Sequence, residues 1–349
     1  MKIGLLTYHN STNYGAVLQT YATCRALKEL GHEVEIIDFR QDEKKYSRSL
    51  IFYFKVKHFR QFMEKYYPKM TEPISDIELL KRREWDFDYL LVGSDQVWNP
   101  QIAKDKLGAY FLNFGSDDKI RLSYASSFGI GEWPKEKEYL VNEIKKDLER
   151  FSCISVREET GRMIMNNTFG LQAHVVVDPT LLHKDYTELT GKVVQNHQII
   201  CYILNRSKQQ LVAVRQLAAQ LGKKPKMIST IHYVKGFSYT YPPSIESWLN
   251  YIAGADFVVT DSFHGLAFSL IFNKQFVVIS PNNGKNSRLL DLLKQVGLEN
   301  RHFFDNSSIP YNKVLEEVID YKIVNILMNA MRETSWKYLR EALNCGVDE

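Results

Sequence analysis

Cysteines are few in this sequence and widely spaced. Cys24, Cys153, Cys201 and Cys345 form no C-x-x-C motif, which favours free thiols in a reducing compartment over a disulfide framework or a zinc site. No apolar run approaches the ~18 residues that cross a bilayer. The N-terminal stretch turns polar after IGLL, which is too short for the apolar core of a signal peptide. These absences predict a cytoplasmic protein.

A strong charge of either sign is also absent. The 349 residues carry a net charge of +4, which argues against nucleic acid binding but permits a locally basic cleft. The nine histidines are scattered, with no i, i+4 pair on a helical stretch, so we expect no metal site. We also expect no bound cofactor. With 44% hydrophobic and 25% charged residues and no tract rich in proline or glycine, the composition is that of a folded globular chain.

Short apolar runs alternate with helical stretches along most of the chain. The run IGLLTY (3–8) precedes an amphipathic stretch at 15–30, Gly31 takes a helix C-cap position, and GHEVEIIDF supplies a second strand. Further strands are expected at 89–94, 121–128, 153–158, 174–179, 199–204, 226–231, 257–261 and 275–280, and helices at 208–221 and 245–254. This order predicts an α/β protein whose parallel sheets are covered on both faces.

The strand series breaks near Asn166–Gly170, and a chain of this length is expected to form two domains. We therefore predict two Rossmann-like domains, 1–170 and 171–311, facing each other across a cleft. The stretch from Asn312 to Leu343 is expected to be helical, and residues 312–349 are expected to return to the first domain. Ligands of such sheets bind at the carboxyl ends of the strands, so polar residues just past those ends are the candidates for a site.

The first strand–helix turn, YHNSTNYGAVLQTYA, contains only Gly15 of the G-x-G-x-x-G pattern, which argues against a dinucleotide site. Two interpretations remain open for its polar residues. Asn13 can cap the helix, or His9, Asn13 and Tyr14 can line a cleft.

The loop VGSDQVWNP follows a strong strand and combines amides, a carboxylate and an indole, a mixture that suits a sugar ring and its hydroxyls. The alternative is a turn around a buried tryptophan. If the loop binds a sugar acceptor, Asp95 is the candidate general base. The acceptor-side residues would be Ser94, Asp95, Gln96, Trp98 and Asn99.

Arg157 ends the strand CISVRE, and its planar fork suits a carboxylate or a phosphate. It could instead be a partner for a neighbouring acid. The acids that follow it, Glu158 and Glu159, favour a helix N-terminus through the helix dipole.

The turn TDSFHG opens a helix and carries several polar groups. Asp261 or Ser262 can cap that helix, and Gly265 lets the backbone approach a ligand. Free N–H groups there would form an anion site, to which His264 could add a charged contact or a proton. The alternative is a structural turn with a structural histidine. Farther on, Lys285 and Arg288 are candidate anion ligands, or ordinary surface cations.

Six segments in order resemble the polysaccharide pyruvyl transferase family: GLLTYHNSTNYGAVLQTYA, LLVGSDQVWNP, SYASSFG, SVREETG, VVDPTLL and DSFHGLAFSLIFNK. The resemblance implies a GT-B-like fold and transfer of pyruvate from phosphoenolpyruvate to a sugar, as a ketal, in capsule or exopolysaccharide synthesis. It implies that Arg157 and His264 hold the donor phosphate. A candidate acceptor is galactose-containing and lipid-linked. The hypothetical acid–base groups are His264 for the donor carbon and Asp95 or Asp261 for the acceptor hydroxyl.

Two other functions remain open. A nucleotide-sugar glycosyltransferase on the same scaffold would be expected to carry an acidic residue in the helix after the His-Gly turn, yet none lies between Asp261 and Asp291. A non-catalytic protein that binds a sugar or an anion could use the same cleft.

The stretch 44–69 holds eight lysines or arginines and one acid, interleaved with aromatic residues. One helical face collects apolar side chains at spacings of three and four: Phe52, Val56, Phe59, Met63 and Tyr66. The stretch predicts an amphipathic helix docked on its own domain. The alternative is a peripheral contact with the inner membrane, which would bring the enzyme to a lipid-linked acceptor.

Overall fold

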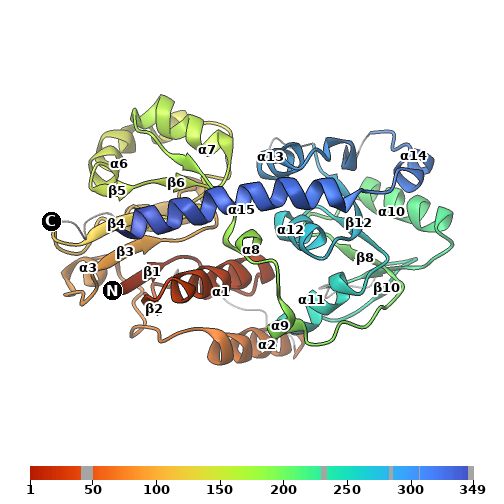
Figure 1. Cartoon of the computed structure of the whole chain (residues 1–349), viewed down its shortest axis with the longest axis horizontal. Helices are drawn as coiled ribbons and strands as arrows, with labels where there is room; N and C mark the ends of the chain where they lie inside the picture. Colours follow the sequence, from red (N-terminus) through yellow and green to blue (C-terminus); the bar gives the residue numbers. More distant parts are fainter. Residues whose placement is uncertain (41–49, 229–233, 283–285, 306, 345–349) are drawn as a thin grey trace. The chain divides into compact units, whose positions relative to one another are not determined.

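A computed structural model describes residues 1–40, 50–228, 234–282, 286–305 and 307–344 (Figure 1). The chain divides into two compact units. Unit 1 comprises Met1–Tyr46, Met63–Leu182 and Ala330–Glu349, and unit 2 comprises Ser47–Phe62 and His183–Asn329. The boundary thus falls after Leu182, whereas the sequence placed it after Gly170. Residues 312–329, expected with the first domain, group with unit 2.

Unit 1 is built on a parallel five-stranded sheet with the order β2-β1-β3-β4-β5. Its strands are β1 (Lys2–Leu6), β2 (Glu33–Ile36), β3 (Tyr89–Val92), β4 (Ile120–Ser123) and β5 (Phe151–Cys153). A separate parallel pair joins β6 (Ser155–Val156) to β7 (His174–Val175). The helices and helical turns are α1 (Tyr14–Glu29), α3 (Ile77–Arg82), α4 (Pro100–Ala103), η1 (Lys104–Lys106), α5 (Leu107–Tyr110), η2 (Lys135–Leu140), α6 (Val141–Leu148), α7 (Glu159–Ile164), η3 (Met165–Phe169) and α8 (Pro179–Leu182).

The first β-α-β unit forms as the sequence predicts. The strand β1 is buried from Ile3 onward because neighbours pair on both of its edges. The side chain of Asn13 accepts hydrogen bonds from the first-turn amides of α1, at 2.9 Å from Gly15 N and 3.4 Å from Ala16 N. Gly31, at φ +84°, ends the helix in the left-handed conformation that glycine tolerates best. Figure 1 shows α8 beside α1 in this unit.

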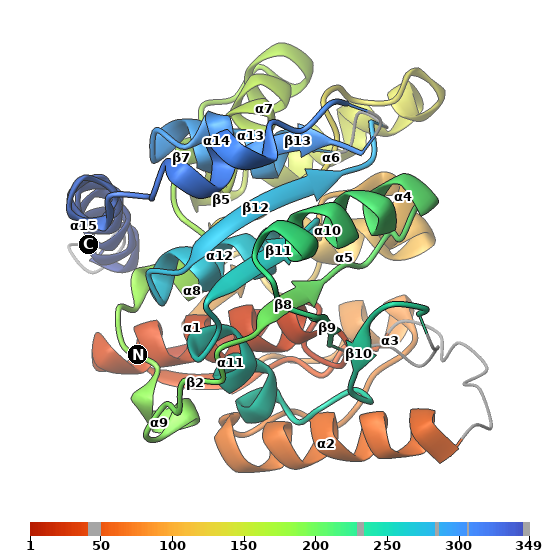
Figure 2. The same cartoon turned by 90° about the vertical axis from the view of Figure 1, so that its right-hand side faces the viewer.

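Unit 2 has a parallel six-stranded sheet with the order β10-β9-β8-β11-β12-β13, and Figure 2 shows β8, β11 and β12 side by side. The strands are β8 (Ile199–Tyr202), β9 (Pro225–Met227), β10 (Ser238–Tyr239), β11 (Phe257–Thr260), β12 (Gln275–Ser280) and β13 (His302–Phe304). The helices are α9 (Thr187–Thr190), α10 (Lys208–Gln220), α11 (Ile245–Ala253), α12 (Phe263–Ile271), α13 (Ser287–Gln295) and α14 (Tyr311–Glu316), with a short turn η4 (Glu299–Arg301).

Alternate residues of the buried strands of unit 2 face opposite helical layers. Ile199 and Val259 share one apolar cluster with Val214 and Leu217 of α10. On α11 and α12, the rings of Trp248 and Phe268 lie 5.6 Å apart, edge to face. Both faces of the sheet are therefore covered, which is why its strands read as continuous apolar runs rather than alternating ones.

The C-terminal helical stretch is interrupted, which the sequence did not predict. The helix α14 ends at Glu316 and α15 begins at Tyr321 and continues to Asn344. Between them, the side-chain amide of Gln275 hydrogen-bonds both backbone groups of Ile319, at 2.8 and 3.3 Å. These bonds replace the helical ones, so the helix cannot continue through Ile319. Among the described residues, no helix is both long enough and apolar enough to cross a membrane.

Candidate functional site

Buried polar side chains gather past the strand ends of unit 1. The central group, named here the Arg157 cluster, consists of Ser94, Arg157, Glu158 and Asp178, each at most 5% exposed. These residues follow β3, β6 and β7, whose carboxyl ends meet at the same edge. Buried polar groups need partners, so the contacts within the cluster show what each side chain can do.

Arg157 is bound mainly to Asp178. Its Nη1 donates to Asp178 Oδ2 at 2.8 Å, and its Nε lies 3.7 Å from Glu158 Oε2. Burial acts to lower the pKa of Arg157, but the charges of Asp178 and Glu158 outweigh it and raise that pKa. The cluster has one cation and two carboxylates. Of the two interpretations from the sequence, these contacts match the partner of an acid.

Asp178 is a residue that sequence reasoning missed. Its Oδ2 also accepts from Ser94 Oγ at 3.0 Å, and its Oδ1 accepts from Thr180 N and Oγ1 at 3.0 and 2.7 Å. The signal was present, because VVDPT places an acid just past a strand end. Glu158 is likewise fixed, since its Oε1 accepts from Ser127 Oγ at 2.7 Å.

The loop after β3 divides into buried and half-exposed residues. Trp98 is 0% exposed, stacks on Phe111 at 5.2 Å between ring centroids, and donates from Nε1 to Tyr110 O at 2.8 Å. The prediction that Trp98 contacts a sugar is therefore wrong, and the buried tryptophan of the alternative describes it. The reason is packing, since the turn directs the indole into the core of unit 1.

The other residues of this loop have local roles. Asp95 adopts φ +82° and its Oδ1 accepts from Gln96 N at 2.8 Å. Asn99 caps α4 through Gln101 N at 2.9 Å and donates to Gln96 Oε1 at 3.2 Å. Asp95 and Gln96 are half-buried, so they remain the loop's available polar side chains, while Ser94 belongs to the Arg157 cluster.

His9 lies just past β1 and is also buried. Its Nε2 donates to Asp38 Oδ1 at 2.9 Å, and Arg40 donates to both oxygens of the same carboxylate. Burial acts to raise the pKa of Asp38, but the hydrogen bonds from His9 and Arg40 outweigh it and lower that pKa to about 2. Of the other two predicted residues in this turn, Tyr14 is buried and Asn13 is an exposed helix cap. The cap matches one interpretation, and neither His9 nor Tyr14 is presented to solvent.

In unit 2, the turn between β11 and α12 is held by backbone bonds. Asp261 accepts from Leu204 N at 2.7 Å and from Asn205 N at 2.8 Å, so it links the ends of β11 and β8. Burial raises the pKa of Asp261, although these bonds act against the shift. Ser262, rather than Asp261, caps α12, with its Oγ at 3.5 Å from Gly265 N.

Gly265 is required by close packing. A Cβ at this position would lie 2.2 Å from Thr260 Oγ1, which donates to Tyr202 O at 2.7 Å. His264 lies in the first turn of α12, 7% exposed, with its ring 5.2 Å from that of Phe263. Arg288 lies half-buried in the first turn of α13, and Lys285 lies outside the described residues.

Within the part of the chain that the structure describes, no group of three or more histidine, cysteine, aspartate or glutamate side chains could hold a metal ion. The side chains predicted for one cleft fall into two sets. His9, Asp95 and Arg157 belong to unit 1, whereas Asp261, His264 and Arg288 belong to unit 2. That the two sets share one ligand stays a prediction.

The fold defines the class of protein. The chain is an α/β protein with two Rossmann-like domains, similar to GT-B glycosyltransferases and epimerases. The spinosyn rhamnosyltransferase SpnG matches 99% of this chain over 100% of its own length, with a TM-score of 0.56 and 10% identity. A putative UDP-N-acetylglucosamine 2-epimerase from Listeria monocytogenes matches 98% of this chain over 95% of its own, with a TM-score of 0.54 and 10% identity. These identities show the fold alone.

The sequence identifies the family within that class. The family model of polysaccharide pyruvyl transferases matches residues 13–283, and the chain belongs to this family. The match includes the Arg157 cluster and the turn before α12. The search of curated proteins found no sequence match.

Proposed function

We propose that the protein transfers the pyruvyl group of phosphoenolpyruvate to two hydroxyls of a sugar in a polysaccharide repeat unit or its lipid-linked precursor, forming a ketal. Membership of the polysaccharide pyruvyl transferase family supports the reaction class. The observation that carries the proposal further is the first turn of α12, where Ser262 and His264 flank the helix N-terminus. Exopolysaccharide or capsule synthesis is the process in which such a product would be used.

The donor requires an anion site. Phosphoenolpyruvate carries a phosphate and a carboxylate, and their desolvation must be offset by N–H donors or cations. The N-terminus of a helix supplies N–H groups and the positive end of its dipole. We assign the phosphate to the start of α12, with Ser262, His264 and Gly265 at the turn, and Arg288 as an added cation. Lys285 remains a candidate from its sequence position.

The ion pair between Arg157 and Asp178 argues against a direct contact of Arg157 with the donor phosphate. A donor phosphate would compete with Asp178 for the same guanidinium, which already has a buried partner at 2.8 Å. We therefore assign Arg157 first to positioning Ser94 and the loop that carries Asp95. A direct contact with the phosphate is the alternative implied by the family resemblance.

The reaction moves two protons. A general acid, for which we propose His264, protonates the methylene carbon of the donor, and a sugar hydroxyl attacks the cationic C2. Asp95 or Asp261 accepts the hydroxyl proton. Phosphate then leaves, and the second hydroxyl attacks C2 to close the ring. The sugar loses two hydroxyl protons. One restores the proton that the general acid gave to the new methyl group, and the other leaves with phosphate.

The test is release of phosphate from phosphoenolpyruvate in the presence of galactose-containing acceptors, with the ketal methyl signal followed by NMR. His264→Ala should abolish transfer and weaken donor binding, whereas His197→Ala, at an exposed histidine of the same unit, should change neither. Absence of both phosphate release and the methyl signal with every acceptor tested would contradict the proposal.

A nucleotide-sugar glycosyltransferase is the second candidate, because the chain shares its fold with such enzymes. Titration of the protein with each donor in turn decides between the two candidates. Binding of uridine or thymidine diphosphate together with indifference to phosphoenolpyruvate would favour the glycosyltransferase. Binding without turnover of either donor would favour a non-catalytic sugar- or anion-binding protein.

We further propose a peripheral contact of α2 (Leu50–Tyr66) with an anionic membrane. Phe59 and Phe62 are 1% exposed, so α2 is an amphipathic helix packed on the protein. The sequence placed it on the first domain, whereas its residues up to Phe62 group with unit 2. Tyr53 and Phe54 point outward at 62% and 47% exposure, with their rings 5.8 Å apart. Lysines and arginines share the exposed side, namely Lys57, Arg60 and Lys65. Exposed aromatic rings beside basic side chains suit the interface of an anionic bilayer.

A further inference from the structure

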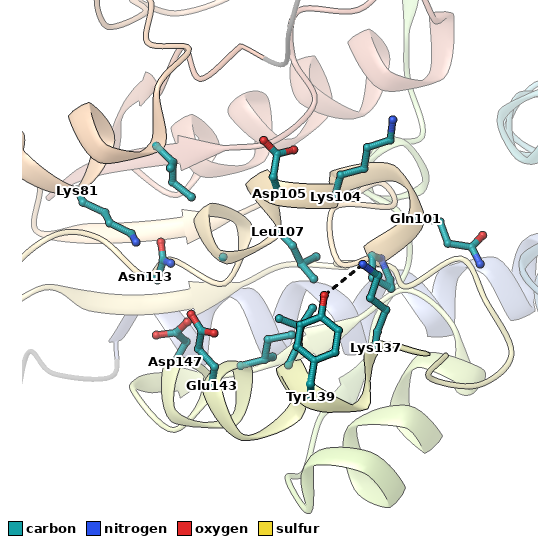
Figure 3. A pocket seen from close by; sticks show the side chains of 15 residues that line it. Lys81, Gln101, Lys104, Asp105, Leu107, Asn113, Lys137, Tyr139, Glu143 and Asp147 are labelled. Atoms are coloured by element: carbon teal, nitrogen blue, oxygen red, sulfur yellow. Dashed lines mark hydrogen bonds between the residues drawn. The ribbon is translucent and has the colours of Figure 1, made fainter. Parts of the chain in front are cut away.

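Unit 1 contains a cavity of about 610 Å³ that the strand-end residues do not line. It lies between α4, η1 and α5 on one side and η2 and α6 on the other (Figure 3). Its volume is within the ~300–1,000 Å³ of small-molecule sites. The proposed reaction does not use this cavity. The kind of ligand that it could bind follows from the side chains that line it.

The charges of the lining cancel. Three lysines, Lys81, Lys104 and Lys137, face three carboxylates, Asp105, Glu143 and Asp147. A cavity with no excess of either sign selects neither an anion nor a cation. Metal binding is also disfavoured, because no metal-binding group of side chains occurs among the described residues.

The described lysines and carboxylates of the lining do not form ion pairs with one another. In the part of the chain that the structure describes, none of the three lysines forms an ion pair with any of the three carboxylates. Lys81 pairs instead with Glu78 at 3.5 Å, which lies outside the lining, and Lys137 lies 3.5 Å from the hydroxyl of Tyr139. Glu143 and Asp147 occupy successive turns of α6, and their carboxylates lie close together at the cavity (Figure 3). The carboxylates are therefore available as acceptors.

An amide in the lining also lacks a partner. Asn113 Oδ1 is buried and, within the described residues, accepts no hydrogen bond. The amide occupies its place because residue 108 is glycine, and a Cβ there would lie 2.4 Å from Asn113 Nδ2. Because the protein covers this oxygen, it is not exposed to the cavity, and the acceptors that the lining offers are the carboxylates.

The remaining surface is apolar and aromatic. Ile77, Leu107 and Ile144 contribute apolar side chains, and Tyr139 projects its ring at the cavity with 72% exposure. A sugar ring has one apolar face of C–H groups and an edge of hydroxyls that both donate and accept. It matches an aromatic platform flanked by carboxylates, amides and ammonium groups with no net charge.

We propose that this cavity binds a neutral saccharide, with its ring on Tyr139 and its hydroxyls hydrogen-bonded to Glu143 and Asp147. The inference rests on the proposed function only in taking the saccharide to be a unit of the acceptor chain. Held there, a longer acceptor would gain affinity from contacts remote from the reacting hydroxyls. An oligosaccharide should then bind better than a single sugar.

The experiment is titration of the full chain, without phosphoenolpyruvate, with neutral tetrasaccharides containing galactose, glucose or mannose, followed by calorimetry and saturation-transfer NMR. At least one should bind, and Tyr139→Ala should weaken it about fivefold or more. Glu143→Gln should also weaken it. Glu149→Gln, next to the same helix but outside the lining, is the matched control and should leave affinity unchanged.

Each contrary outcome has a clear meaning. No binding of any neutral tetrasaccharide, or equal affinity in Tyr139→Ala and the control, would overturn the proposal. Tighter binding of a glucuronate-containing tetrasaccharide than of its neutral counterpart would overturn the assignment to a neutral ligand. Transfer from phosphoenolpyruvate is measured separately with a short acceptor. Intact transfer without tetrasaccharide binding would contradict only the proposed saccharide site. Binding without transfer would contradict only the proposed reaction.

Discussion

Arg157 and Asp178 form a buried ion pair in unit 1, with Nη1 and Oδ2 2.8 Å apart and both side chains at most 1% exposed. The two residues come from different strand–helix turns, so the pair fastens the end of β6 to the end of β7. Removing one partner of such a pair leaves an uncompensated buried charge, which costs far more than the intact pair contributes.

We therefore predict that Asp178→Ala lowers the free energy of unfolding by about 3–5 kcal/mol. Urea unfolding followed by circular dichroism measures the change. Asp118→Ala, at an exposed aspartate of the same unit, should leave the curve nearly unchanged. A loss for Asp178→Ala no larger than that of the control would mean that the pair does not hold the two turns together.

The ionisation of Asp38 should make the free energy of unfolding depend on pH at low pH. Its pKa is about 2 in the folded protein and 3.8 as the ordinary value, so folding favours the charged form. This contribution is present above pH 4 and is lost as the pH falls through 2, and it amounts to roughly 2 kcal/mol. Between pH 5 and pH 3, unfolding free energy should fall less in Asp38→Asn than in the unchanged protein. Parallel curves for the two would show that Asp38 is not the group responsible.

Asp147 should behave in the opposite sense. Burial and the nearby charge of Glu143 raise its pKa from 3.8 to about 6, although Arg150 acts against the shift. Folding therefore favours the neutral acid, and this stability is lost as the pH rises through 6. Because the side chain is half-buried, we expect Asp147→Asn to stabilise the protein at pH 7.5 by only about 1 kcal/mol. A destabilised variant at pH 7.5 would contradict the assignment of an unpaired carboxylate at the saccharide cavity.

The close packing of α12 against β11 predicts a steric effect at Gly265. In Gly265→Ala the new Cβ would approach Thr260 Oγ1 to 2.2 Å, and neither backbone can retreat from the buried turn. The expected cost is about 1–3 kcal/mol of unfolding free energy. Gly131→Ala, where a Cβ meets nothing within 4 Å, is the control. Adding Thr260→Ala should cost less in the Gly265→Ala background than alone, and strict additivity would argue against the contact.

The exposed aromatic pair of α2 predicts binding to anionic vesicles. Replacing Tyr53 and Phe54 by serine should weaken co-sedimentation with phosphatidylglycerol vesicles roughly tenfold, since the buried apolar area is lost. Leu79→Ser, at a side chain that is 60% exposed on α3, should have no effect. Failure of the unchanged protein to bind these vesicles at low salt would remove the proposed membrane contact.

Local patterns in the sequence predicted most of the elements. The runs at Ile3–Leu6 and Val258–Thr260 are apolar and bounded by polar turns, so their strands and the helices that follow could be placed within a few residues. The strands β10 and β13 were not predicted. The break at Ile319 was missed because the group that ends the helix, Gln275, lies far away in the sequence.

The sequence predicted where the polar residues of the candidate site lie, but not which side chains contact one another. Strand ends were the right places to look, because the carboxyl ends of parallel strands carry the polar turns. Which side chains face one another could not be read there. Asp178 binds Arg157 from another turn, and His9 finds its acceptor in Asp38. Trp98 was read as a sugar platform because its neighbours are polar, whereas packing places it in the core.

The sequence by itself determined the α/β class, the family and the turns that carry the polar residues, because these depend on periodicity and on the order of short motifs. Only the tertiary structure decided that Arg157 is already paired with Asp178, that Trp98 is buried and that Gly265 is required by Thr260. The physical reason is the same in each case. A side chain's partners are set by segments that folding brings together, and the free energy of burial decides which charges and rings may remain exposed.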